Sequence, residues 1–561
     1  MLRIIVYNIQ KKGVHMRADT KAKGRLKRLE RATDIGVGKF VDKDNMVRLM
    51  EAVIESGDIV CIEGDNQKQA DFLSGCLAKI NPEKVNALHM VLSTVALGEQ
   101  LDIFEKGIAE KIDFSYSGPQ GLRMAKMAMA GKIKIGNIHT YLELYSRYFT
   151  DLCPNACCIV AEMADREGNL YTGDNTEDTP IVVEATAFRS GIVIAQVNKI
   201  ADTIPRVDVP AGWVDFICES PEPFFLEPLF TRDPAQITET MILTAMIAMK
   251  GIYAKYLPKS LNHGVGFNTA AIELMLPTYG EELGLKNKAC LHWLLNPHPT
   301  MIPAIEEGFV KTIYTVGSEL GMKDYIRSKP DIFPIGSDGS MRSNRAFGQM
   351  CGHYATDMFI GASLQIDPQG NSSTATADRI AGFGGAPNFG CDPKGRRHCS
   401  EAWLKAGEEA YSGLQSPPRG RRLVVQIVET FHGKMEPTFV EKLDAWELQK
   451  KAGFALPPIM IYGDDITHIV TEEGIANLLM CRTYEEREQA IRGVAAYTPM
   501  GLARDHKAVE NLRDRGIIQR AEDLGIRKSD ATRDLLAARN IKDLVKWSEG
   551  LYNPPSRFRN W

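Results

Sequence analysis

Residues suited to substrate binding gather in three turns in the second half of the chain. Residues 264–268 read Gly-Val-Gly-Phe-Asn, residues 296–298 read Asn-Pro-His, and residues 382–390 carry four glycines in nine positions. Each turn comes after a predicted strand, and the strand before the third turn, Met358–Ile366, is a β-branched, apolar run without helical period. Glycine lets the backbone adopt positive φ and approach a ligand closely, so that N–H groups can face a phosphate or a developing oxyanion.

The three turns are expected to share a cleft, because ligands of open α/β sheets bind outside the carboxyl ends of the strands. The turn at 382–390 is followed by a basic run of Lys394, Arg396, Arg397 and His398. It lacks the third glycine of a dinucleotide fingerprint, and no glycine turn ends in the Gly-Lys-Ser/Thr of a P-loop. A G-x-S-x-G nucleophile elbow is also missing. A plain surface turn with a solvated basic end is the competing interpretation.

The elements that position these turns follow an alternating helix and strand pattern, which predicts largely parallel sheets with helices on their faces. In the first half, the predicted strands are Asp58–Gly64, Val85–Leu92, Ile112–Ser117, Ile133–Ile138, Cys157–Glu162, Ile181–Ala185 and Ile192–Val197. In the second half they are Ser260–His263, Ala289–Leu295, Met358–Ile366, Arg422–Thr430, Pro458–Tyr462 and Ile466–Val470.

We expect two domains, 1–234 and 235–561, with the glycine turn in the second. Six prolines between residues 205 and 234 exclude a long helix or central strand, so this stretch is the expected connection. Asp233-Pro234 then predicts the start of a helix from Ala235 to about Ala254. Residues after Tyr484 read as charged amphipathic helices. The first 35 residues form a basic arm, expected to be solvated or partly disordered, with docking of an acidic partner as the alternative.

Composition describes an ordinary globular protein. The 561 residues are 44% hydrophobic and 25% charged, and the net charge of −4 gives no general attraction to nucleic acid. The eleven cysteines form no C-x-x-C pair and show no zinc-ligand spacing, which predicts reduced thiols and no metal site. No apolar run is long enough for a signal peptide or membrane span, so we expect no membrane association and a cytoplasmic location.

Several segments resemble coenzyme A transferases. The turn at 264–268 resembles the G-x-G-x-P opening of their second domain. Residues 382–389 are similar to their G-G-x-x-D/N-F glycine loop, and residues 470–478 to their V-T-E-x-G-x-A-x-L segment. Residues 159–197 resemble the end of their first domain. Within this superfamily, residues 372–398 are most similar to malonate decarboxylase alpha subunits.

The resemblance implies two tandem coenzyme A transferase-like α/β domains with mainly parallel sheets and a helical C-terminal extension. It implies transfer of an acyl-carrier-protein thiol from acetate to malonate, with a coenzyme A-like prosthetic group supplied by the carrier and no metal. The expected partners are the acyl carrier protein, the decarboxylase subunits, malonate and acetate. The expected catalytic residues are Gly384, Gly385, Asn296 and His298. The expected substrate and coenzyme A contacts are Gly264, Gly266, Asn268, Arg379, Gly382, Ala386 and Asn388.

One departure from the family bears on mechanism. Transferases that form an enzyme-bound thioester use a glutamate at a strand end of the second domain, and the matching strand end here carries Asn296 and His298. Glu306 and Glu307 fall on a predicted helix, where exposure is expected. The resemblance therefore implies direct transfer, without a covalent enzyme ester. For three of the expected site residues a purely structural role is the alternative. Asn268 could cap a helix, Asn296 could be a turn residue, and His298 could be a structural histidine.

Three other functions also remain open. A covalent coenzyme A transferase would need a glutamate in the cleft. A citrate lyase alpha subunit would carry out related chemistry on a larger acid. A non-catalytic scaffold would only dock the carrier protein.

Overall fold

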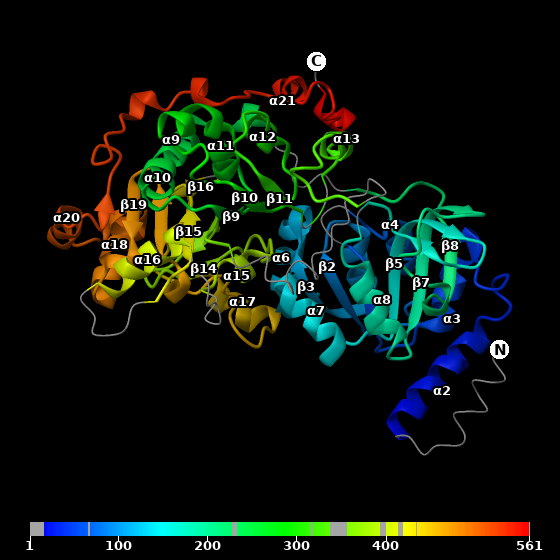
Figure 1. Cartoon of the computed structure of the whole chain (residues 1–561). Helices are drawn as coiled ribbons and strands as arrows, with labels where there is room; N and C mark the ends of the chain where they lie inside the picture. The colour runs from blue at the N-terminus through cyan, green and yellow to red at the C-terminus, as the bar shows by residue number, and fades with distance from the viewer. Residues whose placement is uncertain are drawn as a thin grey trace.

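The computed structural model contains two large β-sheets that lie side by side, each flanked by helices (Figure 1). The described residues are 16–64, 68–174, 176–226, 233–315, 317, 319–336, 356–392, 400–412, 419–433, 435–559 and 561. The α/β class and the mainly parallel sheets expected from the sequence are confirmed. The expected boundary at residue 234 stays a prediction, and residues 227–232 of the proline-rich connection lie outside the described residues.

The first sheet is parallel except for one short strand. Its order is β4-β3-β2-β1-β5-β7-β8, and β6 pairs antiparallel with β5. The strands are β1 (Ile59–Ile62), β2 (Leu88–Thr94), β3 (Ala109–Tyr116), β4 (Lys134–Ile138), β5 (Ala156–Asp165), β6 (Leu170–Tyr171), β7 (Ile192–Ala201) and β8 (Phe216–Glu219). Its helices are α3 (Met46–Val53), α4 (Asp71–Leu77), α5 (Glu99–Glu105), α6 (Gly121–Met129), α7 (Tyr141–Thr150) and α8 (Thr179–Ala187). The central strands β1, β5 and β7 each contain a continuous apolar run because helices cover both faces of the sheet.

The second sheet has the order β11-β10-β9-β12-β15-β18-β19-β20 and is parallel as far as β18. Its strands are β9 (Ser260–His263), β10 (His292–Leu294), β11 (Thr312–Tyr314), β12 (Met358–Gly361), β15 (Leu423–Ile427), β18 (His468–Thr471), β19 (Gly474–Asn477) and β20 (Ile518–Gln519). Two small hairpins pair β13 (Gln365–Ile366) with β14 (Ser372–Ser373), and β16 (Phe431–His432) with β17 (Glu436–Pro437).

Helices surround the second sheet and form most of the C-terminal part. They are α9 (Glu239–Ala248), α10 (Ala254–Tyr256), α11 (Phe267–Met275), α12 (Ile302–Glu306), α13 (Lys323–Arg327), α15 (Ala386–Phe389), α16 (Glu401–Tyr411), α17 (Ala445–Ala452), α18 (Tyr484–Gly493), α19 (Pro499–Leu502), α20 (His506–Asp514) and α21 (Ile541–Trp547). The expected helical extension therefore also contributes a strand, β20, to the sheet.

Four predicted elements differ from the structure. Residues 181–185 lie in helix α8 rather than in a strand, because Pro180 in its first turn favours a helix start and the apolar run is simply buried. The predicted strand 358–366 ends at Gly361, and its last two residues join the β13–β14 hairpin. The predicted strand 458–462 makes only a single bridge, at Ile461. The predicted helix 235–254 begins at Glu239 with Thr238 as its cap, since Asp233 caps only a short 3-10 turn.

Part of the basic arm is an ordered helix, α2 (Met16–Arg31), at the outer side of the first sheet (Figure 1). Arg28 forms ion pairs with Glu55 and Asp58, and Arg25 pairs with Asp215. Residues 16–31 are therefore helical rather than disordered, and the expectation of a solvated arm agrees with residues 20–31, none of which is buried. Residues 1–15 lie outside the described residues.

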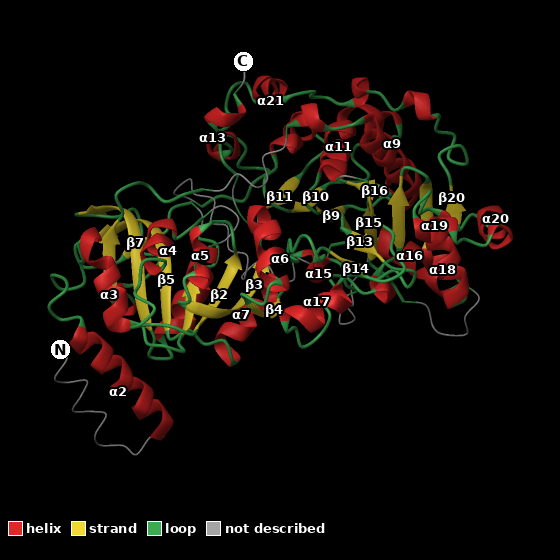
Figure 2. Cartoon of the chain, turned by 180° about the vertical axis from the view of Figure 1, so that it is seen from behind, coloured by secondary structure: helices red, strands yellow, loops and turns green. Residues whose placement is uncertain are grey.

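The glycine turn of the second half is hydrogen-bonded to the carboxyl end of β3 in the first sheet. The Phe383 and Gly384 N–H groups both donate to Ser115 O, at 2.7 and 2.9 Å. The Ser117 N–H donates to Ala381 O at 2.9 Å, and the Ile380 N–H to Gly121 O at 3.0 Å. Figure 2 shows α6 and α15 near each other between the two sheets. Backbone bonds therefore join the two halves at this turn.

Replacing Gly382 with alanine should break this junction. Gly382 has φ of 80°, and an added Cβ would lie 2.5 Å from Ser115 O and 2.7 Å from Tyr116 Cα. The left-handed conformation alone costs an L-residue about 1–2 kcal/mol. The matched control is Gly57→Ala, because Gly57 has φ of 82° with nothing near the added Cβ. Chemical denaturation should show Gly382→Ala less stable than Gly57→Ala by about 1–3 kcal/mol. Equal stability of the two variants would contradict the observed packing.

Candidate functional site

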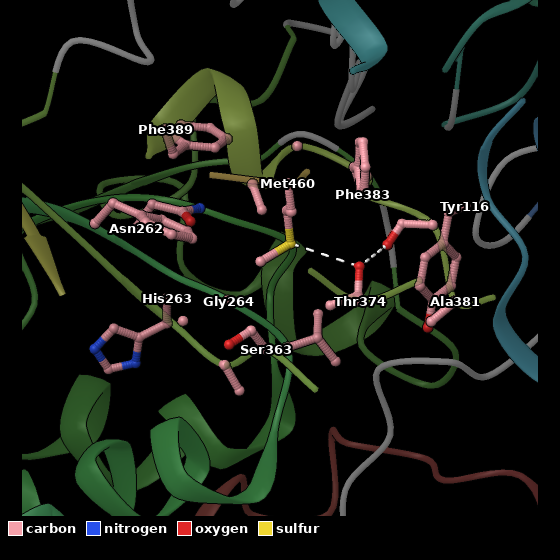
Figure 3. Close-up of a pocket in the computed structure, with 18 of the residues that line it drawn as sticks. Tyr116, Asn262, His263, Gly264, Ser363, Thr374, Ala381, Phe383, Phe389 and Met460 are labelled. Carbon is pink, nitrogen blue, oxygen red and sulfur yellow. Dashed lines mark hydrogen bonds between the residues drawn. The ribbon is translucent and has the colours of Figure 1, made fainter. Parts of the chain in front are cut away.

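A cavity of about 320 Å³ opens between the two sheets (Figure 3). It lies beyond the carboxyl ends of β9, β10 and β12, and the first half closes it with Tyr116 from β3 and Tyr141 from α7. Its volume falls in the range of small-molecule sites. The expected position at strand ends is therefore correct, and the first half contributes to the same space.

The structure brings most of the predicted site residues to this cavity. The residues that line it are Gly264, Asn296, His298, Arg379, Gly382, Gly384, Gly385 and Ala386. Gly266, Asn268 and Asn388 are not among its lining residues. Asn268 is the second residue of helix α11, whose N-cap is Gly266, so the alternative of Asn268 as the helix cap is wrong. The Asn388 side chain accepts a hydrogen bond from the Leu142 N–H at 3.4 Å. The basic run at 394–398 lies outside the described residues.

The glycine turn offers fewer free donors than its sequence predicts. Gly382 and Gly384 have positive φ, of 80° and 57°, whereas Gly385 has φ of −89°. The Gly384 N–H is occupied by its bond to Ser115 O. Within the described part of the chain the Gly385 N–H makes no hydrogen bond. Of Gly384 and Gly385, the two glycines expected to be catalytic, only Gly385 therefore has an N–H without a partner in the described residues.

A buried carboxylate, Glu273 of α11, lies behind the strand-end residues and was missed by the sequence analysis. Its Oε1 accepts from His263 Nδ1 at 3.0 Å and lies 3.3 Å from His298 Nδ1, while Thr300 Oγ1 donates to Oε2. Burial opposes ionisation of Glu273, but the charge of His298 and the bond from His263 outweigh it and hold the pKa of that carboxyl below its usual range.

The proton positions in this cluster follow from the bonds. Burial, only partly offset by Glu273, lowers the pKa of His263 and keeps its ring neutral. Burial also raises the pKa of Tyr253, whose hydroxyl lies 2.8 Å from His263 Nε2. Tyr253 thus donates to Nε2, and His263 donates from Nδ1 to the carboxylate. His298 must likewise carry its proton on Nδ1, because the acceptor facing that nitrogen is a carboxylate.

Two buried hydrogen-bond donors on the cavity wall have no partner among the described residues. They are Asn296 Nδ2 and Ser363 Oγ, of residues that are 5% and 8% exposed. Ser363 follows β12 and appears beside Gly264 in Figure 3. Native proteins satisfy nearly all buried polar groups, so orphaned donors on a cavity wall indicate a ligand-binding role. Ser363 gave no sequence signal, since it is one serine in an ordinary loop.

The described cavity wall carries one arginine and no acidic side chain. Its lining residues include Arg379 and the imidazoles of His263 and His298, but no aspartate or glutamate. Arg379 is exposed, and its guanidinium has no acidic partner among the described residues. Such a wall favours an anionic ligand. In the same described residues, no cluster of three or more His, Cys, Asp or Glu could hold a metal, and no helix is long and apolar enough to span a bilayer.

Removing the orphaned hydroxyl of Ser363 should not destabilise the fold. A buried hydroxyl without a partner contributes only its desolvation cost, so Ser363→Ala should change the free energy of unfolding by less than about 0.5 kcal/mol, or raise it. The matched variant is Ser373→Ala, which loses a 2.7 Å bond to Pro458 O and a 3.0 Å bond from the Ala375 N–H. It should cost about 1–2 kcal/mol. Urea titrations compare the two, and a larger loss for Ser363→Ala would show that its hydroxyl is already satisfied.

Comparison with known proteins agrees with this geometry. Residues 17–561 match the family described as malonate decarboxylase, alpha subunit, transporter. The acetyl-S-ACP:malonate ACP transferase of Malonomonas rubra is 62% identical over 526 residues, which cover 93% of this chain and 95% of that protein. A crystal structure of a Pseudomonas malonate decarboxylase hetero-tetramer in complex with malonate contains a chain that is 54% identical. The match covers 98% of this chain and all of that one, with a TM-score of 0.93.

A more distant structure shows the fold alone. The putative alpha subunit of citrate lyase from Streptococcus mutans, solved with citrate, is 14% identical with a TM-score of 0.57, over 92% of this chain and 87% of that one. The coenzyme A transferase-like fold expected from the sequence is thereby confirmed. This chain belongs to the malonate decarboxylase alpha subunit family.

Proposed function

We propose that this chain converts acetyl-S-ACP and malonate into malonyl-S-ACP and acetate by direct transfer, without a covalent enzyme ester. The name of the 62% identical relative supports the reaction. The observation that carries the mechanism is the described cavity wall, which presents donors and positive charge but no carboxylate that could become acylated.

The transfer needs two steps. In the first, a malonate carboxylate oxygen attacks the acetyl carbonyl carbon, a C–O bond forms, and the C–S bond breaks. This gives acetyl-malonyl anhydride and the carrier thiolate. In the second, the thiolate attacks the malonyl carbonyl carbon, and acetate leaves with the oxygen that bridged the anhydride. Both steps place negative charge on a carbonyl oxygen, which preorganised donors stabilise.

The cavity residues divide these tasks in our proposal. The Gly385 N–H stabilises the oxyanion of the thioester carbonyl, and the Gly264 turn supports the acyl group. Tyr116 and Tyr141 exclude water from the reactive anhydride, and the narrow cavity holds carboxylate and thioester together. Exposed Arg379 guides the anionic, coenzyme A-like arm of the carrier to the cavity. The carrier protein and the decarboxylase subunits would be its partners in the cytoplasm.

The covalent alternative would need a glutamate at the reacting carbon. Two buried glutamates near the strand-end residues are Glu273 and Glu177, and neither lines the cavity. Glu273 is held by His263, His298 and Thr300. Glu177 belongs to the first half, and both it and Asn296 pack against Gly317. A Cβ added to Gly317 would lie 2.6 Å from Glu177 Oε1 and 2.6 Å from Asn296 Nδ2, so the two side chains are close together. We therefore favour direct transfer over the covalent mechanism.

An exchange assay tests the reaction. Acetylated carrier protein and labelled malonate should give labelled malonyl carrier and one acetate per transfer in the presence of the chain. Absence of exchange would favour the scaffold alternative, and preference for citrate over malonate would favour a citrate lyase-like activity.

Intact-mass spectrometry tests the mechanism. After mixing with acetyl-S-ACP alone, the enzyme should keep its mass, because no side chain becomes acylated. A stoichiometric acyl or thioester adduct on Glu177 or Glu273 would replace the direct mechanism with the covalent one.

Substituting Gly385 should impair turnover more than folding. Its φ of −89° suits valine, but the added Cβ would lie 3.2 Å from the Phe389 ring and 3.7 Å from the Tyr141 ring, so the branched side chain crowds the cavity wall beside the proposed donor. Loss of one oxyanion donor typically lowers kcat by about 100- to 1,000-fold. Gly212→Val is the control, since nothing lies near an added Cβ there. A Gly385→Val enzyme that folds and keeps more than about a tenth of its kcat would remove Gly385 from the mechanism.

A further inference from the structure

Both unpartnered donors on the cavity wall need a hydrogen-bond acceptor. Asn296 Nδ2 follows β10 and Ser363 Oγ follows β12, and the strand between their parent strands in the sheet is β9. Each donor lies in a residue that is more than nine-tenths buried, so bulk water satisfies it poorly. A carboxylate can accept both hydrogen bonds at once, and charge-assisted bonds are the strong ones in a shielded site.

His298 adds a polarised imidazole to the same wall. Its Nδ1 faces the Glu273 carboxylate at 3.3 Å, and the ring lines the cavity. Glu273 is itself fixed by His263 and Thr300, so it cannot turn away. The carboxylate faces Nδ1 and fixes the orientation of the ring, so the imidazole keeps one position on the cavity wall.

We propose that Asn296, Ser363 and His298 form a subsite for the free carboxylate of malonate, and that Glu273 is the positioning residue that sets the proton and orientation of His298. This inference rests on the proposed function and names how the site selects its acid. Malonate has a second carboxylate, one methylene away from the reacting one, whereas acetate has none. Binding of the second carboxylate distinguishes malonate from acetate at the same reacting carbon.

The test measures selectivity rather than activity alone. With acetyl-S-ACP as donor, wild-type enzyme and variants are assayed with labelled malonate and, in the identity exchange, with labelled acetate. The preference for malonate, taken as the ratio of the two kcat/KM values, should fall about tenfold to a hundredfold in Ser363→Ala. The loss should reside mainly in KM for malonate. Ser74→Ala, which removes a buried hydroxyl of helix α4, is the matched control and should keep the wild-type ratio.

Glu273→Gln tests the positioning residue separately. Glutamine keeps the shape of the side chain and loses its charge, so the preference for malonate should fall in this variant too. Glu273→Asp keeps the charge and should restore part of the preference. A purely structural role would lower exchange of malonate and acetate equally. If Glu273→Gln does not fold, Ser363→Ala and Asn296→Leu still decide whether the subsite exists.

Direct binding separates this inference from the proposed function. Calorimetric titration of malonate into the carrier-free chain should give a clear affinity for wild type and an affinity about tenfold or more weaker for Ser363→Ala. If the wild-type enzyme exchanges neither acid but binds malonate, and Ser363→Ala weakens that binding, the proposed function is refuted and the malonate subsite is supported. An unchanged malonate ratio together with an unchanged malonate affinity in Ser363→Ala would overturn the subsite.

Discussion

The hydrogen bonds from the glycine turn to Ser115 are the constraint on which the site depends. Two successive N–H groups, of Phe383 and Gly384, share one carbonyl oxygen at the end of β3. This places the turn of the second half against Tyr116, which belongs to the first half and lines the cavity. The cavity therefore exists only while the two halves stay joined. The same bonds occupy the Gly384 N–H, whereas the Gly385 N–H has no partner among the described residues.

Behind the strand-end residues, burial of the Glu273 carboxylate determines where negative charge lies relative to the cavity. Glu273 is fully buried, and three donors keep it ionised in spite of its desolvation. An isolated carboxylate in that position would take up a proton, so the histidines and Thr300 are needed for the charge to persist. The arrangement keeps the negative charge behind His298 and away from the substrate. An anionic acid that enters the cavity then meets hydrogen-bond donors and no carboxylate that would repel it.

The positions of the turns could be predicted from sequence, because glycine and asparagine after apolar strands carry a local signal. The turns at 264–268, 296–298 and 382–390 follow from that signal, and each of them contributes residues to the cavity wall. Family resemblance then supplied the fold, which local patterns alone do not specify. Residues 181–185 show the limit of such patterns, because a short buried β-branched run suits a helix as well as a strand.

The remaining site residues could not have been found from sequence. Tyr116 and Tyr141 reach the cavity only because the two sheets pack together, and no local pattern reports that contact. Glu273 lies on an apolar helix and Ser363 in an ordinary loop, so their roles emerge only from burial and missing partners. Gly384 was expected to be a donor, and its partner, Ser115, is far away in the chain.

The source of the oxygen in the released acetate tests direct transfer most closely. Enzyme in excess over acetyl-S-ACP is mixed with malonate labelled with oxygen-18 in both carboxyl groups, and acetate from the first turnover is analysed by mass spectrometry. Direct transfer predicts that each acetate carries one labelled oxygen, because the bridging atom of the anhydride comes from malonate. Unlabelled acetate in the first turnover would contradict the account, since its added oxygen would then have come from an enzyme carboxylate.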